Sequence, residues 1–300
     1  MGQKLFVYGS LVPSEIAYGL IEDLVSEQQR AQIRGANIFV RDAFPLITID
    51  KENFSNSSVY GTLLTPKLNQ WDELIRIVEQ YENSQYSLVE GIEVETSNGT
   101  ELCSVFVAAH PARSDDEPLD GSWSSARHPM FCQAFAEIGI QIANLEDQFD
   151  VSDRSIADFG RSYWQKIIQA EGLYLVQFSV MEELVRLKFS HSKDGLTASS
   201  GFSRLADELL WIEATSKAVI PSFSVYVNDN KSKLETTGTP KKNMRAWYAV
   251  RNNLAHRGKT SSGDYEKVMC ALKGMHSVME IYFQLIFPDI SDSWDNYLLN

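Results

Sequence analysis

The chain has 300 residues, a net charge of −13 and 44% hydrophobic residues. This length favours about two domains, and the acidity disfavours nucleic acid as a partner of the chain as a whole. No apolar run reaches the roughly 18–20 residues that cross a bilayer, and Met1–Tyr8 is typical of a strand and not of a signal peptide. The cysteines Cys103, Cys132 and Cys270 form neither a disulfide framework nor a metal motif. We therefore expect a cytoplasmic protein without a membrane partner, a metal or another cofactor.

The first third of the chain predicts several strands and one helix. Short runs rich in β-branched and aromatic residues predict the strands, and Ser97-Asn98-Gly99 favours a hairpin turn. Apolar residues at helical spacing from Trp71 to Val78 predict a helix with Asn69 as its cap. The predicted strands are Leu5–Tyr8, Ala36–Val40, Leu46–Ile49, Val59–Leu64, Ile92–Glu95 and Cys103–Val107. These elements predict a compact α+β domain over residues 1–109.

The rest of the chain changes character twice. Residues 110–129 have the Pro, Gly, Ser and Asp content of a linker. From residue 130 onward, helical periodicity replaces the strand signals. The exception is a polar loop predicted over residues 221–240, with one short extended piece at Phe223–Val227. The predicted helices are Phe131–Asp147, Ile156–Ala170, Tyr174–Phe189, Phe202–Ala218, Asn243–His256 and Tyr265–Phe287. Residues 130–300 therefore predict an all-α helical bundle.

Two features of the first domain have the chemistry of a ligand site. A strand ends in Tyr8-Gly9-Ser10-Leu11, where Gly9 lets the backbone approach a ligand and exposed N–H groups can bind a carboxylate. Glu82 lies at the end of the predicted helix, in a junction of the kind that commonly carries catalytic residues. Taken singly, each feature is also typical of an ordinary strand end or of an exposed helix-end glutamate.

Taken together, the motifs resemble the gamma-glutamylcyclotransferase-like family. Along the chain, the segments Phe44–Ile47 and Val59–Leu63 lie between the Tyr8–Leu11 loop and Glu82. Tyr81-Glu82 is then followed by Tyr86 and a hairpin. This order of motifs carries the resemblance, which covers Lys4–Ala109. The resemblance implies a small β-barrel with flanking helices. It also implies that the substrate's own α-amine attacks its γ-carbonyl to release 5-oxoproline and an amine. The residues implied are Glu82 as catalytic proton shuttle and Tyr8, Gly9, Ser10, Leu11 and Tyr86 as substrate-binding residues.

The chain departs from the family pattern beside the glutamate. Asn83 occupies a position that is usually Gly in the family, and Glu79 one that is often Asp. These departures leave the substrate open. They also leave open a ligand-binding domain with little or no turnover.

The two halves of the chain differ in charge. Residues 1–150 carry a net charge of −14, from 9 Lys and Arg against 23 Asp and Glu, whereas residues 151–300 carry +1, from 18 against 17. The window Lys231–Lys273 alone has 10 basic and 3 acidic residues, a net charge of +7. Such a cluster is typical of a phosphate-binding surface and also of a solvated helix face.

The basic window contains Arg251-Asn252 and His256. An Arg can hold a phosphate and a His can move a proton, which is the chemistry of metal-independent RNA cleavage. In a regular helix, residues five apart are about 140° out of phase. A shared site therefore needs a tightened or broken last turn, with Gly258 as the helix stop. The alternative is a surface Arg and a His stabilised by the helix dipole.

The motif consists of an Arg, a polar residue, three further residues and a His. With this motif, the region of about Ile156–Phe287 resembles the HEPN family of ribonucleases. The resemblance implies a homodimer and a metal-independent endoribonuclease that leaves a 2',3'-cyclic phosphate. In that reading Arg251 binds phosphate, Asn252 orients the site and His256 is the acid–base group. The RNA-binding residues expected from the basic window are Lys241, Lys242, Arg245, Arg257 and Lys259.

Three hypotheses follow. The leading one is an HEPN endoribonuclease, a toxin or anti-phage effector, with a cyclotransferase-like catalytic or sensing domain in front and an inhibitor or complex partner protein. The second is a metabolic gamma-glutamyl cyclotransferase whose helical domain serves dimerisation. The third is a non-catalytic interaction scaffold.

Overall fold

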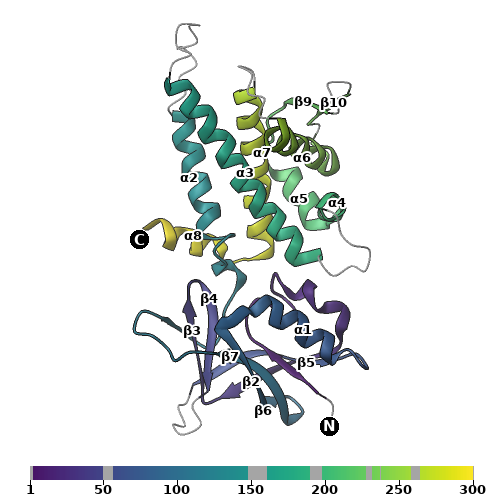
Figure 1. Ribbon diagram of the computed structural model, residues 1–300, viewed down its shortest axis with the longest axis vertical. Coiled ribbons are helices and arrows are strands. Elements are labelled where there is room, and N and C mark those ends of the chain that lie inside the picture. Colours follow the sequence, from purple (N-terminus) through teal and green to yellow (C-terminus); the bar gives the residue numbers. More distant parts are fainter. Residues whose placement is uncertain are drawn as a thin grey trace. The chain divides into compact units, whose positions relative to one another are not determined.

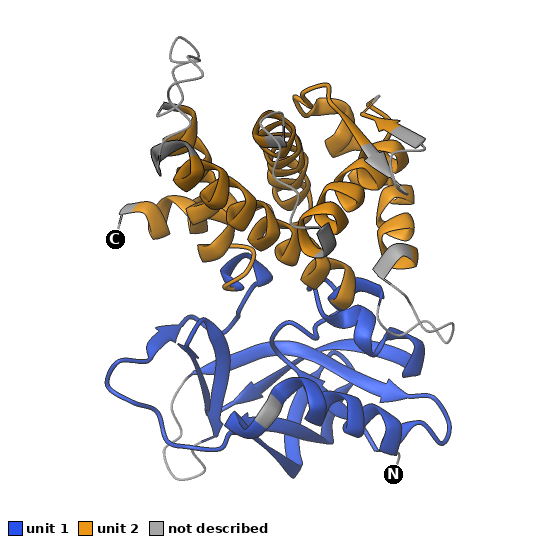
Figure 2. Ribbon diagram, turned by 45° about the horizontal axis from the view of Figure 1, so that its top comes forward, with its two compact units in different colours: residues 1–128, 187–195 blue, residues 129–186, 196–300 orange. Residues whose placement is uncertain are grey.

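The structure, a computed structural model, describes residues 3–49, 57–147, 161–189, 198–227, 232–236, 238–257 and 264–299. The chain divides into two compact units (Figure 2). Unit 1 comprises Met1–His128 with Leu187–Gly195, and unit 2 comprises Pro129–Arg186 with Leu196–Asn300. Among the helices described, none is both long enough and apolar enough to cross a membrane.

Unit 1 is built around a closed five-stranded barrel (Figure 1). Its strands, in barrel order, are β1 (Leu5–Val7), β5 (Ser58–Pro66), β2 (Val25–Arg34), β6 (Tyr86–Thr96) and β7 (Gly99–Ala108). Strand β1 pairs antiparallel with β5 and parallel with β7, which closes the barrel. This barrel confirms the predicted small α+β barrel domain.

The barrel is flanked by a second sheet and by helices. The sheet has the order β4 (Phe44–Ile49), β3 (Ala36–Arg41) and β8 (Glu117–Leu119). The α-helix is α1 (Trp71–Glu82), and the short 3-10 helices are η1 (Tyr18–Leu20), η2 (Glu22–Leu24), η3 (Asn83–Gln85) and η4 (Ser125–Arg127). Asn69, the predicted cap of α1, has a positive φ of 61°. The Leu74 N–H donates a hydrogen bond to the carbonyl of Gln70, so Gln70 takes the capping position in place of Asn69.

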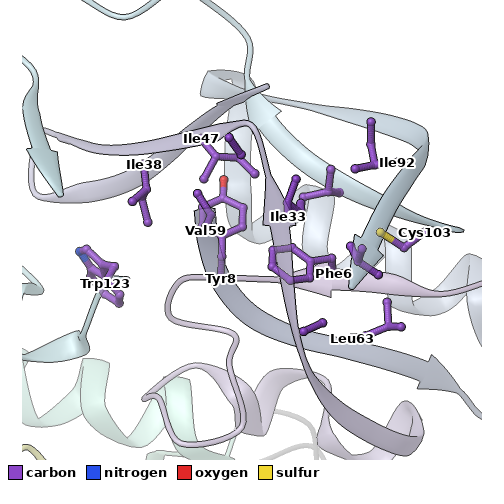
Figure 3. Close-up of a cluster of buried hydrophobic side chains, with 14 residues drawn as sticks. Phe6, Tyr8, Ile33, Ile38, Ile47, Val59, Leu63, Ile92, Cys103 and Trp123 are labelled. Atoms are coloured by element: carbon purple, nitrogen blue, oxygen red, sulfur yellow. The ribbon is translucent and has the colours of Figure 1, made fainter. Parts of the chain in front are cut away.

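The core of unit 1 lies between the barrel strands and the second sheet (Figure 3). Because side chains alternate along a strand, Phe6 and Tyr8 enter this core from the same face of the chain. Their rings lie 6.4 Å apart and are stacked. Trp123 joins the cluster and is 6% exposed. Residues well beyond the last barrel strand therefore contribute to the core.

Two segments of unit 1 differ from the sequence-based expectation. Strand β2 was not predicted, because Ser26–Arg30 is polar and only Ala31 and Ile33 of the strand are buried. Residues 110–128, predicted to be linker, instead fold within unit 1. Strand β8 pairs with β3, and Arg41 forms a buried ion pair of 2.6 Å with Asp116. The polar residues of this stretch therefore take part in strand pairing and in an ion pair within unit 1.

Unit 2 is helical with one small hairpin. Its helices are α2 (Gln133–Asp147), α3 (Arg161–Phe189), α4 (Ala198–Asp207), α5 (Leu209–Lys217), α6 (Pro240–Arg257), α7 (Asp264–Ile286) and α8 (Ile290–Leu299). Helix α5 packs against α7, and α4 packs against α6. Trp211 and Tyr282 meet edge to face with ring centroids 5.0 Å apart, and the Tyr174 hydroxyl donates to the Trp247 carbonyl at 2.7 Å.

Several elements of unit 2 also differ from expectation. The helices predicted around Ala170 and Tyr174 form one continuous helix in α3, since Gly172 does not break it. The predicted helix Phe202–Ala218 divides at Glu208, whose backbone is extended with ψ 137°. Strands β9 (Ser224–Val227) and β10 (Ser232–Glu235) pair antiparallel. Strand β9 coincides with the extended piece predicted at Phe223–Val227, whereas β10 lies where a loop was predicted, so the unit is not all-α. Helix α8 was not predicted.

We expect Trp123→Ala to lower the free energy of unfolding by about 3–5 kcal/mol, the usual cost of removing a buried Trp side chain. Urea denaturation followed by circular dichroism measures it. The control is Leu68→Ala, because Leu68 is 89% exposed; it should change stability by no more than about 0.5 kcal/mol. Equal stabilities for the two variants would show that residues 110–128 do not support the core of unit 1.

Candidate active site

Helix α1 places Glu82 at a junction between a helix and a strand. Leu74, Ile77 and Val78 are buried and fix one face of the helix against unit 1. The helix ends at Glu82, η3 follows, and β6 begins at Tyr86. The chain therefore turns tightly between Glu82 and Tyr86, which keeps the carboxyl and the phenol close together.

The loop Tyr8–Leu11 is a tight turn after β1. The Gly9 carbonyl accepts from the Val12 N–H at 3.0 Å, and the Ser10 carbonyl accepts from the Ala17 N–H at 2.9 Å. Within the described part of the chain, the N–H groups of Gly9, Ser10 and Leu11 donate to no acceptor. Backbone N–H groups gathered in a turn are suited to bind an anionic oxygen.

Gly9 permits a close approach that no other residue would. A Cβ atom at this position would lie 2.7 Å from Cγ of Pro45, well inside contact distance. Pro45 also accepts a hydrogen bond of 2.8 Å from the Tyr86 hydroxyl through its carbonyl. The start of β4 thus touches both the loop and the tyrosine that follows Glu82.

Two further hydrogen bonds fix the side chains around the loop. The Tyr8 hydroxyl donates to the Phe106 carbonyl at 2.8 Å. The hydroxyl oxygens of Ser10 and Tyr81 lie 2.8 Å apart and share a hydrogen bond. Tyr81 immediately precedes Glu82, so this bond ties the loop to the end of α1.

The carboxyl of Glu82 has an unusual acidity. Burial raises its pKa from 4.5 to about 8, although the residue as a whole is only half-buried. Burial also raises the pKa of Tyr86, with the nearby Glu82 and Tyr81 as further causes. The pKa of Tyr8 is raised by burial and by the proximity of Tyr86 and Glu82. The carboxyl and the two phenols therefore share one desolvated environment.

This arrangement suits proton transfer at neutral pH. A carboxyl with a pKa near the working pH exchanges a proton in both directions most efficiently. The two phenols stay protonated, and their protons bond backbone carbonyls. Glu82 is thus the group in this cluster that can gain and lose a proton near pH 7.

An open hollow on unit 1 lies elsewhere. It has a volume of about 380 Å³ and contains none of the residues named above. Its lining is Lys4, Glu27, Gln28, Gln29, Leu63, Thr65, Ser97 and Asn98. This hollow is therefore distinct from the surroundings of Glu82.

In unit 2, helix α6 carries the sequence-predicted ribonuclease residues. Arg251 Nη2 lies 3.5 Å from Glu182 Oε1 of α3 and forms a partly exposed ion pair. Arg251 Nη1 also lies 3.5 Å from Asn252 Oδ1. The helix continues regularly to Arg257, so the expected break before His256 is absent from the described helix. The backbone places Arg251 and His256 about 140° apart around the axis.

The predicted RNA-binding residues lie along the same helix. Lys241, Lys242 and Arg245 are exposed in its first turns, and Lys241 pairs with Asp207 at 2.7 Å. Arg257 ends the helix, and Lys259 lies outside the described residues. In the part of the chain that is described, no group of three or more His, Cys, Asp or Glu side chains is arranged to hold a metal ion.

Comparison with known proteins places unit 1 in a class. Residues 5–125 match the family model described as gamma-glutamyl cyclotransferase, AIG2-like. No curated protein shows significant similarity to the chain. The family match ends before unit 2 begins, and it includes the loop Tyr8–Leu11, Glu82 and strand β8. The N-terminal domain is therefore gamma-glutamyl cyclotransferase-like, and it extends beyond the predicted boundary at residue 109.

Three solved structures illustrate what unit 1 is similar to. YkqA from Bacillus subtilis is 21% identical over 43% of this chain and 42% of its own, with a TM-score of 0.33. An AIG2-like protein from Mus musculus is 16% identical over 41% of this chain and 88% of its own, with a TM-score of 0.34. A gamma-glutamyl cyclotransferase is 13% identical over 39% and 70%, with a TM-score of 0.27. This chain thus spans less than half the length of YkqA.

Sequence reasoning missed some contributors to the site. Tyr81 and Pro45 lie within quoted motifs, but neither was assigned a role. Glu15 and Ser125 were not singled out, because they are 110 positions apart and carry no local pattern. The Ser125 N–H donates to the Glu15 carboxylate, and the Ser125 hydroxyl accepts from the Ile16 N–H next to the loop.

We expect Glu82→Gln to stabilise the protein increasingly as pH rises from about 4.5 to 8. The raised pKa means that the folded state binds more protons than the unfolded state in this window, so ionising Glu82 costs stability as pH rises through it. Gln has no such cost. Melting temperatures at stepped pH measure the difference, with Glu79→Gln, an exposed residue of the same helix, as the matched control. A Glu82→Gln difference that does not vary with pH would show that the carboxyl is not buried.

Proposed function

We propose that unit 1 is a gamma-glutamyl cyclotransferase that releases 5-oxoproline from gamma-glutamyl amines or peptides. The observation that carries this proposal is the buried carboxyl of Glu82, with a pKa of about 8, beside a turn with free N–H groups. The family match over residues 5–125 supports the reaction class. The match to a family model does not name the amine that is released.

The reaction requires the protein mainly to hold the reacting atoms close together and to transfer protons. The α-ammonium of the substrate loses a proton to Glu82, and its nitrogen attacks the γ-carbonyl carbon. A C–N bond forms within the new five-membered ring, and the original amide C–N bond breaks. Glu82 returns this proton to the departing amine, which also gains the second proton that the ring nitrogen loses and so leaves as an ammonium, and the atoms balance without water. An intramolecular attack of this kind gains chiefly from holding the reacting atoms close.

The turn and the phenols supply that position. The N–H groups of Gly9, Ser10 and Leu11 would bind the substrate's carboxylate, and the tight contact of Gly9 with Pro45 leaves the turn little freedom. A substrate ammonium near Glu82 favours the ionised carboxylate, since opposite charges lower a carboxyl pKa. Substrate binding thus prepares the base that the first step requires.

We expect Glu82→Gln to lower kcat for 5-oxoproline release by about 10²- to 10⁴-fold, the usual contribution of a general acid–base group. The assay measures 5-oxoproline from a panel of gamma-glutamyl amines and peptides. In the wild type, kcat/KM should rise with pH towards about 8 as Glu82 ionises. Glu79→Gln is again the control and should keep its activity. Unchanged turnover in Glu82→Gln would exclude Glu82 as the proton shuttle.

A second candidate function belongs to unit 2. Helix α6 carries five Lys and Arg residues and no Asp or Glu, and its Arg251 and Asn252 side chains are adjacent. We propose that this helix contacts RNA phosphates in a metal-independent ribonuclease formed by a homodimer, with a partner protein as inhibitor. The pairing of Arg251 with Glu182 opposes phosphate binding. This second function therefore requires the ion pair to open.

If α6 cuts RNA, purified protein should cleave total RNA in EDTA and leave 2',3'-cyclic phosphate ends. His256→Ala should abolish that cleavage, because it removes the acid–base group of the motif. His110→Ala in unit 1 is the matched control and should cleave like the wild type. Absence of wild-type cleavage, or cleavage that persists in His256→Ala, would reject the ribonuclease function for the isolated protein.

A further inference from the structure

The segment that ends unit 1 returns to the candidate active site. After β8, the Gly121 carbonyl accepts from the Tyr60 N–H at 2.8 Å, and Trp123 enters the core. The short helix η4 (Ser125–Arg127) follows, capped by the Ser124 hydroxyl, which accepts from the Ala126 N–H at 3.2 Å. The segment is thus held on the barrel up to the point where η4 meets residues 15–17.

Ser125 forms two hydrogen bonds with the segment Glu15–Ile16. The Ser125 N–H donates to Oε2 of Glu15 at 2.6 Å, and Oγ of Ser125 accepts from the Ile16 N–H at 3.2 Å. Ser125 is fully buried. Burial raises the pKa of Glu15, and the hydrogen bonds from Ser125 oppose that rise. Both bonds therefore join a buried residue of η4 to residues 15 and 16.

The bonded pair lies one hydrogen bond away from the substrate loop. Ala17, next to Ile16, donates its N–H to the Ser10 carbonyl at 2.9 Å. A chain of hydrogen bonds thus runs from η4 through residues 15–17 into the turn that carries the free N–H groups. Ile16 and Ala17 are buried, so this segment cannot shift without breaking contacts.

The end of the same segment also contacts the start of β4, which lies beside the loop Tyr8–Leu11. His128 is buried and meets the ring of Phe44 edge to face, with ring centroids 5.7 Å apart. Phe44 precedes Pro45, which touches Gly9 and accepts the Tyr86 hydroxyl bond. Ser125 therefore contacts the segment that supports the loop Tyr8–Leu11, and His128 contacts the start of β4.

We propose that Ser125 and Glu15 are positioning residues that hold the loop Tyr8–Leu11 in its substrate-binding conformation. They do not touch the reacting atoms; they act through Ile16, Ala17 and the Ser10 carbonyl. This proposal rests on the cyclotransferase function proposed above. Because η4 is followed by His128 and then by Pro129, the first residue of unit 2, the pair also joins the substrate loop to the chain that leads into unit 2.

The test compares Ser125→Ala with Ser124→Ala in the full chain. Both remove one hydroxyl from the same η4 turn, but only Ser125 bonds residues 15–17. We expect Ser125→Ala to lower kcat/KM for gamma-glutamyl amines by about 10- to 100-fold, since small displacements of a binding group cost that much. Ser124→Ala should stay within about twofold of the wild type. The loss should appear mainly in KM, because the loop binds and Glu82 remains in place.

A second pair of variants separates hydrogen bonding from packing. Glu15→Gln keeps an oxygen that can accept from the Ser125 N–H, so it should retain most of the activity that Glu15→Ala loses. Hydrogen–deuterium exchange over residues 10–17 gives a readout that does not depend on turnover. Exchange should be faster in Ser125→Ala and Glu15→Ala than in the wild type and in Ser124→Ala.

The outcomes are distinguishable. If hydrogen–deuterium exchange over residues 10–17 is unchanged in Ser125→Ala and Glu15→Ala, the proposal is overturned whatever their activity. If exchange is faster but kcat/KM and KM are unchanged, the positioning role is overturned. If the wild type releases no 5-oxoproline from any gamma-glutamyl compound in the panel, the proposed function fails. Exchange over residues 10–17 then decides alone whether Ser125 and Glu15 hold the loop.

Discussion

The desolvated carboxyl of Glu82 is the constraint around which unit 1 is arranged. A buried carboxylate needs hydrogen bonds or a positive charge to stay ionised. The nearest phenols do not provide them, because the Tyr86 and Tyr8 hydroxyls donate to the carbonyls of Pro45 and Phe106. The protons that would stabilise the carboxylate are thus engaged elsewhere, and the pKa stays high. The same bonds rigidify the walls of the site.

The high pKa of Glu82 has a consequence for the proposed reaction cycle. The free protein holds a proton on Glu82 near neutral pH, which keeps an uncompensated charge out of the core. An arriving ammonium supplies the missing positive charge and favours loss of that proton. The ionised base therefore appears when substrate is present, so the fold does not bear the cost of a permanently buried carboxylate.

The sequence predicted the parts of unit 1 that have local patterns. Alternating apolar strands, the Ser97-Asn98 hairpin and the helix ending at Glu82 were recognised because each pattern is short and regular. Strand β2 was missed because most of it is polar and exposed. The Ser125–Glu15 bond was missed because it joins distant residues, and its segment was assigned to a linker on composition alone. Long-range pairing leaves no local signal of this kind.

The motif in unit 2 has less structural support than the site in unit 1. Arg251 and His256 have side-chain types that suit phosphate chemistry, but a regular α6 sets them about 140° apart, and Glu182 neutralises Arg251. A basic helix face also has a simpler role, since lysines and arginines at the surface keep a helical unit hydrated. The cluster in unit 1 needs only groups within one unit, whereas cleavage by α6 needs an ion pair to open and a second chain to complete the site. The cyclotransferase chemistry therefore requires fewer unobserved steps.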